Sequence, residues 1–358
     1  MSTINNLPVE VISKILNMLW KRDIYQCLFV NKKFYSASVL VLWKAIGIYS
    51  KEEFDQCLYG LNSSKHHIGN NVKDITIAHY CIRGEDFVNM LPLIPNLEAL
   101  HIITCTGLTE ESIMQVSQYC KQLRTLALGY SAISYQSAIS LSHCSHLSSL
   151  YFKCCPSLTS EALRAFINLP IERLTIKHCR WLTTVETAYD VRSLTCLKHL
   201  NIQIDNDELV EFIRCLTVDD KGMPYLPYLQ AFGIEGTMTQ PFPFDIPIVS
   251  FLKAHPHLRD LYLFSVGVSD EMLKNMDCYL PDLESLLIEE ECTEFSAQSI
   301  RDIVYCCPKL SKLEMYDCSF SSYEFPEIYH KLESFKLMLD SADIQLIRAQ
   351  QTTKRIDE

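Results

Sequence analysis

Leu123-Arg124-Thr125-Leu126-Ala127-Leu128 is one of eleven copies of a six-residue pattern, L-x-x-L-x-L, that returns along most of the chain. Positions 4 and 6 of the pattern are two residues apart, so they share one face of a short strand and point inward. Successive first positions are separated by 25, 26, 24, 24, 26, 32, 29, 25, 27 and 22 residues. The copies are Val72-Ile75-Ile77, Leu97-Leu100-Ile102, Leu123-Leu126-Leu128, Leu147-Leu150-Phe152, Ile171-Leu174-Ile176, Leu197-Leu200-Ile202, Leu229-Phe232-Ile234, Leu258-Leu261-Leu263, Leu283-Leu286-Ile288, Leu310-Leu313-Met315 and Leu332-Phe335-Leu337.

A period of this length with this pattern is typical of leucine-rich repeats. Helical spacing precedes most copies, as in residues 110–120, where Thr109 is the expected N-cap. One unit cannot bury its own aliphatic side chains, whereas stacked units bury a continuous core. The pattern therefore predicts an α/β fold, a curved leucine-rich-repeat solenoid with a parallel β-sheet on its concave face. Proline two positions before a copy is expected to end the helix there, at Pro95, Pro227, Pro256, Pro281 and Pro308.

Seven of the 16 cysteines follow the same period. A zinc site would need C-x-x-C or a Cys/His cluster, and no C-x-x-C occurs in the chain. A thiol is small and buriable, so we expect structural cysteines in tight turns, no metal and no disulfide framework. The arrangement resembles the cysteine-containing subclass of leucine-rich repeats. Cysteine stands eight residues after a first motif position at Cys105, Cys155, Cys179 and Cys318, and three before it at Cys120, Cys144 and Cys307.

The first 46 residues do not fit the repeat and predict three short helices. One helix opens at Leu7-Pro8, Asp23 is the expected cap of the second, and Asn31 is the expected cap of the third. The apolar residues of these helices occupy more than one face. This surplus either packs against the first repeat or forms a docking surface that a partner completes.

The same segment resembles an F-box. The resemblance rests on Leu7-Pro8-x-Glu10-Val11-Ile12-x-x-Ile15-Leu16, then Cys27-x-x-Val30-Asn31 and Leu42-Trp43. An F-box followed by leucine-rich repeats implies a substrate receptor of SCF ubiquitin ligases, in which the F-box binds the Skp adaptor, and through it cullin, while the repeats hold the substrate. The resemblance implies an adaptor-facing set of Leu7, Pro8, Ile12, Ile15, Leu16, Leu28, Val30 and Phe34, although some of these must face the internal core.

Positions 3, 5 and 7 of each copy should project from the concave face and offer a substrate surface. Lys153, Arg173 and Lys177 would form a basic stripe for an acidic or phosphorylated substrate segment. A solvated strand face with no ligand is the alternative. The candidate substrate-binding residues are Tyr151, Lys153, Arg173, Lys177, His199, Tyr262 and Phe264. Later copies add Glu235, Asp260, Glu289, Glu314 and Tyr316, so the face becomes acidic and aromatic toward the C-terminus.

The expected domain limits follow from these patterns. They are an F-box at 1–46, a helical linker or cap at 47–71, the repeats at 72–340, and a C-terminal cap and tail at 341–358. Ile344, Leu346 and Ile347 are expected to form a capping helix over the last repeat. The long spacings include Asp219–Gly222 and the proline-rich run 241–247, which either contact a partner or are irregular repeats.

Composition excludes several classes of function. The formal net charge of -11 argues against nonspecific nucleic-acid binding. No secretory signal is visible, and no apolar run approaches the roughly 18 residues that span a bilayer. The chain has neither a Gly-rich phosphate loop nor a G-x-S-x-G elbow. We therefore expect a non-catalytic protein of the cytoplasm or nucleus with no cofactor. A repeat scaffold that acts outside any ligase is the alternative function.

Overall fold

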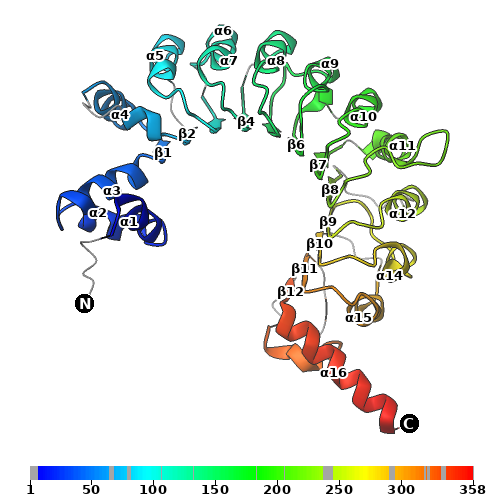
Figure 1. Cartoon of the computed structure of the whole chain (residues 1–358). Coiled ribbons are helices and arrows are strands. Elements are labelled where there is room, and N and C mark those ends of the chain that lie inside the picture. The colour runs from blue at the N-terminus through cyan, green and yellow to red at the C-terminus, as the bar shows by residue number, and fades with distance from the viewer. Residues whose placement is uncertain are drawn as a thin grey trace. The chain divides into compact units, whose positions relative to one another are not determined.

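The computed structural model describes residues 7–63, 68–78, 82–105, 107–131, 133–182, 184–204, 206–236, 245–289, 295–317, 320, 323–331 and 336–357. It divides into two compact units, Met1–Leu158 (unit 1) and Thr159–Glu358 (unit 2). In the repeats of each unit, the strands lie on one side and the helices that connect them lie on the other (Figure 1). We call the strand surface that points away from the helices the inner face.

Unit 1 begins with a module of three helices and continues with repeats. Its elements are α1 (Val9–Leu16), α2 (Lys21–Cys27), α3 (Lys32–Leu42), β1 (Ala45–Ile48), α4 (Lys51–Ser63), η2 (Ile68–Asn71), β2 (Asp74–Ala78), α5 (Gly84–Met90), η3 (Leu91–Leu93), β3 (Ala99–Ile103), α6 (Glu110–Met114), α7 (Val116–Tyr119), β4 (Thr125–Gly129), α8 (Tyr135–Leu141) and β5 (Ser149–Lys153).

Unit 2 continues the repeats and ends in a long helix. Its elements are α9 (Ser160–Arg164), β6 (Arg173–Lys177), η4 (Arg180–Leu182), α10 (Val185–Val191), β7 (His199–Gln203), α11 (Asn206–Thr217), β8 (Ala231–Glu235), α12 (Asp245–Ala254), β9 (Asp260–Phe264), α13 (Asp270–Leu273), α14 (Met276–Tyr279), β10 (Ser285–Glu289), α15 (Ala297–Cys306), β11 (Lys312–Tyr316), η5 (Pro326–Lys331), β12 (Lys336–Leu339) and α16 (Ser341–Asp357).

The predicted leucine-rich-repeat fold is confirmed within each unit. Motif positions 4 and 6 are buried in strand after strand, as Leu126 and Leu128 are in β4. Parallel pairing keeps them in register, so that Leu100 lies beside Leu126 and Ile102 beside Leu128. Because the inward side chains of neighbouring strands align, the core runs continuously along the stack.

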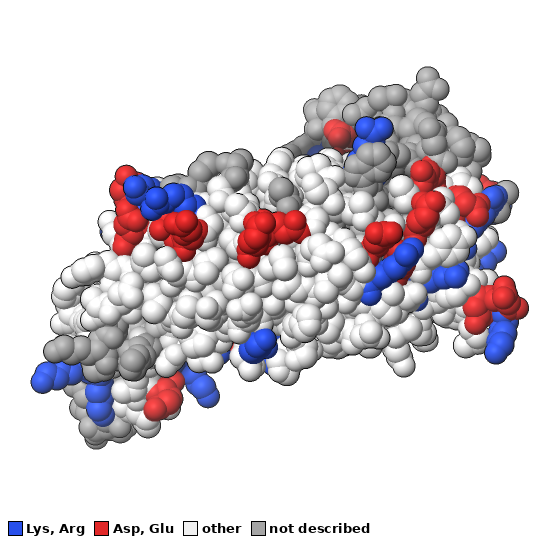
Figure 2. All heavy atoms as spheres, turned by 90° about the horizontal axis from the view of Figure 1, so that it is seen from above, with Lys and Arg blue, Asp and Glu red and all other residues white. Residues whose placement is uncertain are grey.

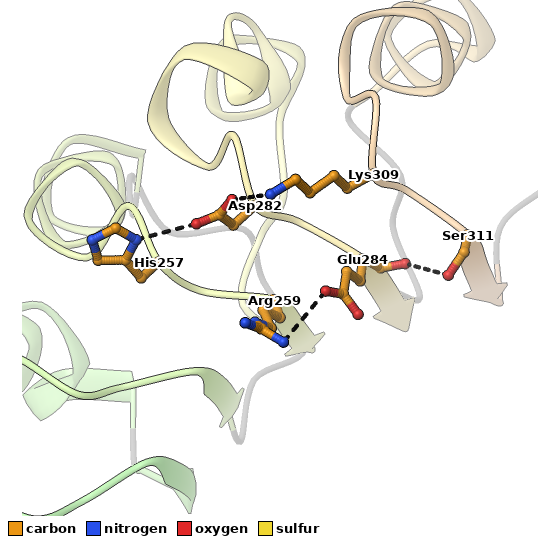
Figure 3. Close-up of polar contacts among 6 residues, drawn as sticks. All are labelled: His257, Arg259, Asp282, Glu284, Lys309 and Ser311. Carbon is orange, nitrogen blue, oxygen red and sulfur yellow. Dashed lines mark hydrogen bonds and ion pairs between the residues drawn. The ribbon is translucent and has the colours of Figure 1, made fainter.

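Hydrogen bonds at motif position 2 reinforce this register. The backbone N–H of Arg124 donates to the Glu98 carbonyl at 2.7 Å, and the corresponding groups of Arg259 and Glu284 are joined at 2.8 Å. Some side chains at this position also pair, as Arg259 and Glu284 do at 3.7 Å. Figure 3 shows this pair together with a second group of three residues, in which the Asp282 carboxylate accepts from His257 and from Lys309. These outer contacts link neighbouring repeats at the start of each strand.

Two features at the ends of the sheet differ from the expected repeat. Strand β1 precedes the eleven copies and pairs with β2, placing Ile46 beside Ile75. The sequence pattern missed it because Trp43, rather than an aliphatic residue, stands three residues before Ile46. Strand β12 pairs with β11 in the antiparallel sense. Leu337 of the eleventh copy lies in this antiparallel strand, whereas Leu332 and Phe335 lie outside the described residues. The sequence pattern could not predict the strand direction, because period-2 alternation of apolar residues is the same for either direction.

Two of the predicted N-cap residues, Asn31 and Thr109, are confirmed by hydrogen bonds from their side chains. Asn31 Oδ1 accepts from the N–H groups of Lys33 and Phe34 at 2.9 and 3.0 Å, and Thr109 Oγ1 accepts from Ser112 at 3.3 Å. The expected cap at Asp23 is wrong, because α2 begins two residues earlier, and Asp23 lies in its first turn.

The described cysteines at the two recurring motif positions are buried, as expected, whereas Cys196, Cys278 and Cys306 are exposed. Cys105 Sγ donates to the Ile77 carbonyl, and Cys155 Sγ to that of Leu128, both at 3.4 Å. Burial raises the pKa of the Cys120 thiol to about 12, and Cys144 beside it adds to this effect. Burial also raises the pKa of Cys144 to about 11. These thiols stay protonated and act as small apolar groups. Cys318 lies outside the described residues.

These raised pKa values predict a loss of stability in alkali. The folded chain holds the thiol protons more tightly than the unfolded chain, whose thiol pKa is about 9. The stabilisation is therefore complete below pH 9 and is lost as the pH rises toward 11 to 12. In urea unfolding, Cys120→Ala with Cys144→Ala should show a shallower fall of unfolding free energy above pH 9 than the wild type. Equal slopes would contradict the assignment.

The C-terminal helix closes the stack. Ile344 and Ile347 of α16 are fully buried, as the capping prediction requires, whereas Leu346 is exposed. Helix α16 continues to Asp357. Arg348 donates from Nε to the Val304 carbonyl at 2.7 Å and from Nη2 to the Cys307 carbonyl at 2.6 Å. These carbonyls lie at the C-terminal end of α15, and that of Cys307 also accepts from the N–H of Leu310 at 3.2 Å.

We expect Arg348→Ala to lower the free energy of unfolding by about 1–3 kcal/mol, because buried carbonyls lose charged donors. Urea titration measures this loss. The matched control is Gln345→Ala, an exposed change on the same helix, which should be close to neutral. Equal effects of the two changes would show that Arg348 does not hold the cap.

Candidate functional site

The helical module of α1–α3 has a closed core of its own. Ile12 and Leu16 of α1 are 1% exposed and pack against Phe34 and Ala37 of α3. Leu7, Val9, Cys27 and Val41 surround this cluster. The module is therefore held together by residues at helical spacing that do not need a partner for their burial.

The surface of the same module is unusually apolar. Met18, Trp20 and Phe29 are 86%, 84% and 84% exposed, and Val30 is 59% exposed. Phe29 and Val30 follow the C-terminus of α2, where the chain turns toward the Asn31 cap. A concentration of exposed apolar side chains around a closed core indicates a binding surface. The others between residues 11 and 40 are Val11, Ile15, Leu19, Tyr25, Tyr35 and Leu40.

The predicted adaptor-facing residues fall into two groups. Ile12, Leu16 and Phe34 are buried in the core of the module, so they support the surface from beneath and are not available to a partner. Pro8, Ile15 and Val30 are exposed, whereas Leu7 and Leu28 are half-buried. Contact of the exposed group with an adaptor stays a prediction. Sequence reasoning missed Met18, Trp20 and Phe29, which lie in turns where helical periodicity gives no signal.

A cleft of about 480 Å³ adjoins this surface. It lies between α2, α3, β1 and α4, and Leu28 belongs to its lining with Tyr25 and Tyr35. The Trp43 ring forms part of the wall and packs on Gly60 of α4, where an added Cβ would approach it to 2.5 Å. The cleft is thus formed by the module together with the first strand of the sheet.

The inner face of unit 2 carries the second set of candidate residues. Its strands alternate buried side chains with partly or fully exposed ones. The predicted residues at the second kind of position are Arg173 and Lys177 on β6, His199 on β7, and Tyr262 and Phe264 on β9. Tyr151 and Lys153 are half-buried on β5 and belong to unit 1. The structure therefore brings five of the seven predicted residues onto one sheet face.

Lys177 is already occupied within this face. Its Nζ lies 2.9 Å from Glu235 Oε2 and 5.3 Å from the centroid of the Phe264 ring. Gln203 donates to the other oxygen of Glu235 at 3.2 Å and accepts from the N–H of His178 at 2.7 Å. The charge of Lys177 is thereby neutralised, which leaves Arg173 as the exposed basic side chain of this pair.

The electrostatics of the neighbouring strands are acidic. Burial raises the pKa of the Asp260 carboxyl, and the charge of Glu284 raises it further. Burial also raises the pKa of Glu289, with added repulsion from Asp317 and Glu235. The pKa of His199 is lowered by burial and then by Arg173, so this imidazole is neutral at pH 7.

The outer, helical side has fewer features that indicate a binding site. Figure 2 looks onto it from above and shows scattered charged groups with broad uncharged surface between them. Residues 125–152 contain no Asp, Glu, Lys or Arg. Within the described ranges, no three His, Cys, Asp or Glu side chains are placed to hold a metal ion. None of the described helices combines the length and the apolarity needed to cross a bilayer.

Comparison with known proteins gives a short match. No family model matches the chain. The F-box protein COS111 of Yarrowia lipolytica is 43% identical over 53 residues, which are 15% of this chain and 10% of that protein. The chain thus matches about a tenth of the length of this curated relative. Together with the repeat architecture, the match supports an F-box/leucine-rich-repeat family.

Solved structures with similar folds are distant in sequence. An internalin of Listeria monocytogenes aligns with 87% of this chain and 92% of its own, with a TM-score of 0.40 and 14% identity. A chain of a TLR13–ssRNA13 complex aligns with 63% of this chain and 34% of its own, with a TM-score of 0.37 and 15% identity.

The contrast between core and surface of the module can be measured. We expect Leu16→Ala to lower the free energy of unfolding by about 2–5 kcal/mol, because it opens a cavity in a closed core. Phe29→Ala should leave stability within about 0.5 kcal/mol of the wild type, because its side chain is in water. Urea denaturation followed by circular dichroism tests both. A large loss on Phe29→Ala would show that this residue belongs to the core.

Proposed function

We propose that the chain is the substrate-recognition subunit of a cullin-RING (SCF) ubiquitin ligase. In this proposal the α1–α3 module binds a Skp-type adaptor, which binds cullin, and the repeats hold the protein to be ubiquitylated. The observation that carries the proposal is the exposed apolar surface over the closed core of the module. The F-box relative supports the same assignment.

The physical case for docking rests on solvation. Side chains such as Trp20, Phe29 and Val30 are mostly in water in the free chain, and their burial in an interface is favourable by roughly 25 cal/mol per Å². Aromatic residues are also enriched among those that dominate binding energy at interfaces. Since the core beneath is already closed, binding needs no refolding of the module.

The proposed mechanism is proximity. The chain contributes no catalytic group, and the bound substrate reacts because the complex holds it near a ubiquitin-charged enzyme. The proposed location is the cytoplasm, the nucleus or both. The substrate would bind the partly exposed strand side chains of the repeats, because these are the positions that packing of the solenoid leaves free.

Adaptor binding gives the direct test. We expect Phe29→Ala with Val30→Ala to weaken capture of a Skp-type adaptor by the full chain at least about tenfold, because two exposed apolar contacts are removed together. The measurement is titration of purified adaptor against the chain by biolayer interferometry. Tyr59→Ala is the matched control, since Tyr59 is 75% exposed on α4, outside the module.

Circular dichroism melting of the same samples separates binding from folding. A variant that melts like the wild type and still binds the adaptor equally well would refute docking through this surface. Failure of the wild-type chain to bind any Skp-type adaptor would instead favour a repeat scaffold that acts outside a ligase.

A further inference from the structure

The inner face of unit 2 carries aromatic rings that are covered by the chain's own lysines. Lys177 Nζ lies 5.3 Å from the centroid of Phe264, and Lys336 Nζ lies 5.2 Å from that of Tyr316. For Lys177 the same ammonium also pairs with Glu235 at 2.9 Å. A cation held between a carboxylate and a ring face is thus a contact that this sheet already makes once.

Asp260 and Tyr262 also provide a carboxylate and an aromatic ring, but no lysine or arginine of the described ranges is held between them. They are two residues apart on β9, so they project from the same face, and both are half-buried. Among the described residues, no Lys or Arg nitrogen lies within ion-pair distance of the Asp260 carboxylate, and none covers the Tyr262 ring. Lys312, on β11, instead pairs with Glu314 at 3.1 Å.

Small side chains on the β8 side leave room for a partner at this point, whereas β10 on the other side places Ser285 and Leu287 beside Asp260 and Tyr262. The neighbouring strand β8 carries Ala231 and Gly233 at the positions beside Asp260 and Tyr262. Neither presents a side chain large enough to cover them, and the side chain that approaches Gly233 is the uncharged Asn201. Burial raises the pKa of Asp260 because its charge is poorly solvated, and Glu284 raises it further. His199, Arg259 and Lys312 lower this pKa only in part, and none of them forms an ion pair with Asp260 in the described part of the chain. A cation from outside would relieve this cost.

We propose that the inner face of β9 binds a lysine or arginine side chain of a partner protein, through an ion pair with Asp260 and a cation–π contact with Tyr262. The partner segment would therefore be basic, in contrast to the acidic or phosphorylated segment expected from the basic stripe. Charge complementarity selects this occupant, because Glu289 on the adjoining strand β10 also lacks an ion pair among the described residues, and burial raises its pKa as it does that of Asp260. The binding site itself does not depend on the proposed function, but its role as a substrate site does.

The test selects random dodecapeptides displayed on phage against the immobilised full chain at about 50 mM salt, where exposed ion pairs are weakly screened. We expect the selected peptides to be enriched in Lys or Arg. A fluorescein-labelled copy of the best peptide should bind Asp260→Asn about tenfold to a hundredfold more weakly, because a charge-assisted contact is lost. Asp260→Lys should abolish binding, because it supplies an internal cation.

Two controls make the result specific. Glu271→Gln removes a carboxylate that is 77% exposed on α13 and should leave peptide binding unchanged. Asp260→Asn should melt at or slightly above the wild-type temperature, because the carboxylate makes no ion pair in the described part of the chain and its charge is poorly solvated. Selected peptides that lack basic residues, peptides that bind Asp260→Asn as well as the wild type, or no selected peptide at all would each overturn the proposal. Adaptor capture by Asp260→Asn should be unchanged, so a failure here is distinct from a failure of the ligase proposal.

Discussion

Each repeat depends on the burial of two aliphatic side chains that its own strand and helix cannot enclose. In β4 these are Leu126 and Leu128, and both become fully buried only with the neighbouring strands hydrogen-bonded in register. Because every repeat relies on its neighbours for burial, the first and last repeats need other elements to cover their exposed sides. Strand β1 meets this need at the start, and antiparallel β12 with α16 meets it at the end. Leu337 and Leu339 are buried there although the strand runs backwards.

The helical module follows a different rule. Ile12 and Leu16 close its core against Phe34, so the module does not depend on the stack for its burial. Its remaining apolar side chains stay in water, at a cost that an unpartnered structural domain would have no reason to carry. The two parts of the chain therefore differ in the kind of surface that they present. The module presents apolar groups, whereas the inner face of unit 2 presents charges and aromatic rings.

On that inner face most charges satisfy one another. Lys177 pairs with Glu235, and Lys312 with Glu314. A list of basic and acidic positions along the strands cannot reveal this, because it counts paired and unpaired groups alike. Asp260 and Glu289 form no ion pair in the described part of the chain, and burial raises the pKa of both. Asp260 differs in having the ring of Tyr262 two residues away on the same face. The charged groups that the fold leaves unpaired are the ones that indicate the charge of a ligand.

The amino-acid sequence alone determined the repeat, the positions of its strands, the buried cysteines and the caps at Asn31 and Thr109. Each of these depends on local spacing and side-chain chemistry, which are visible in one dimension. Tertiary structure decided the direction of β12, the existence of β1, the burial of Ile12, Leu16 and Phe34, and the pairing of Lys177 with Glu235. Those features depend on contacts between residues that are distant along the chain, such as the 58 residues that separate Lys177 from Glu235. Periodicity shows which side chains point inward, but only the folded chain decides which neighbours they meet.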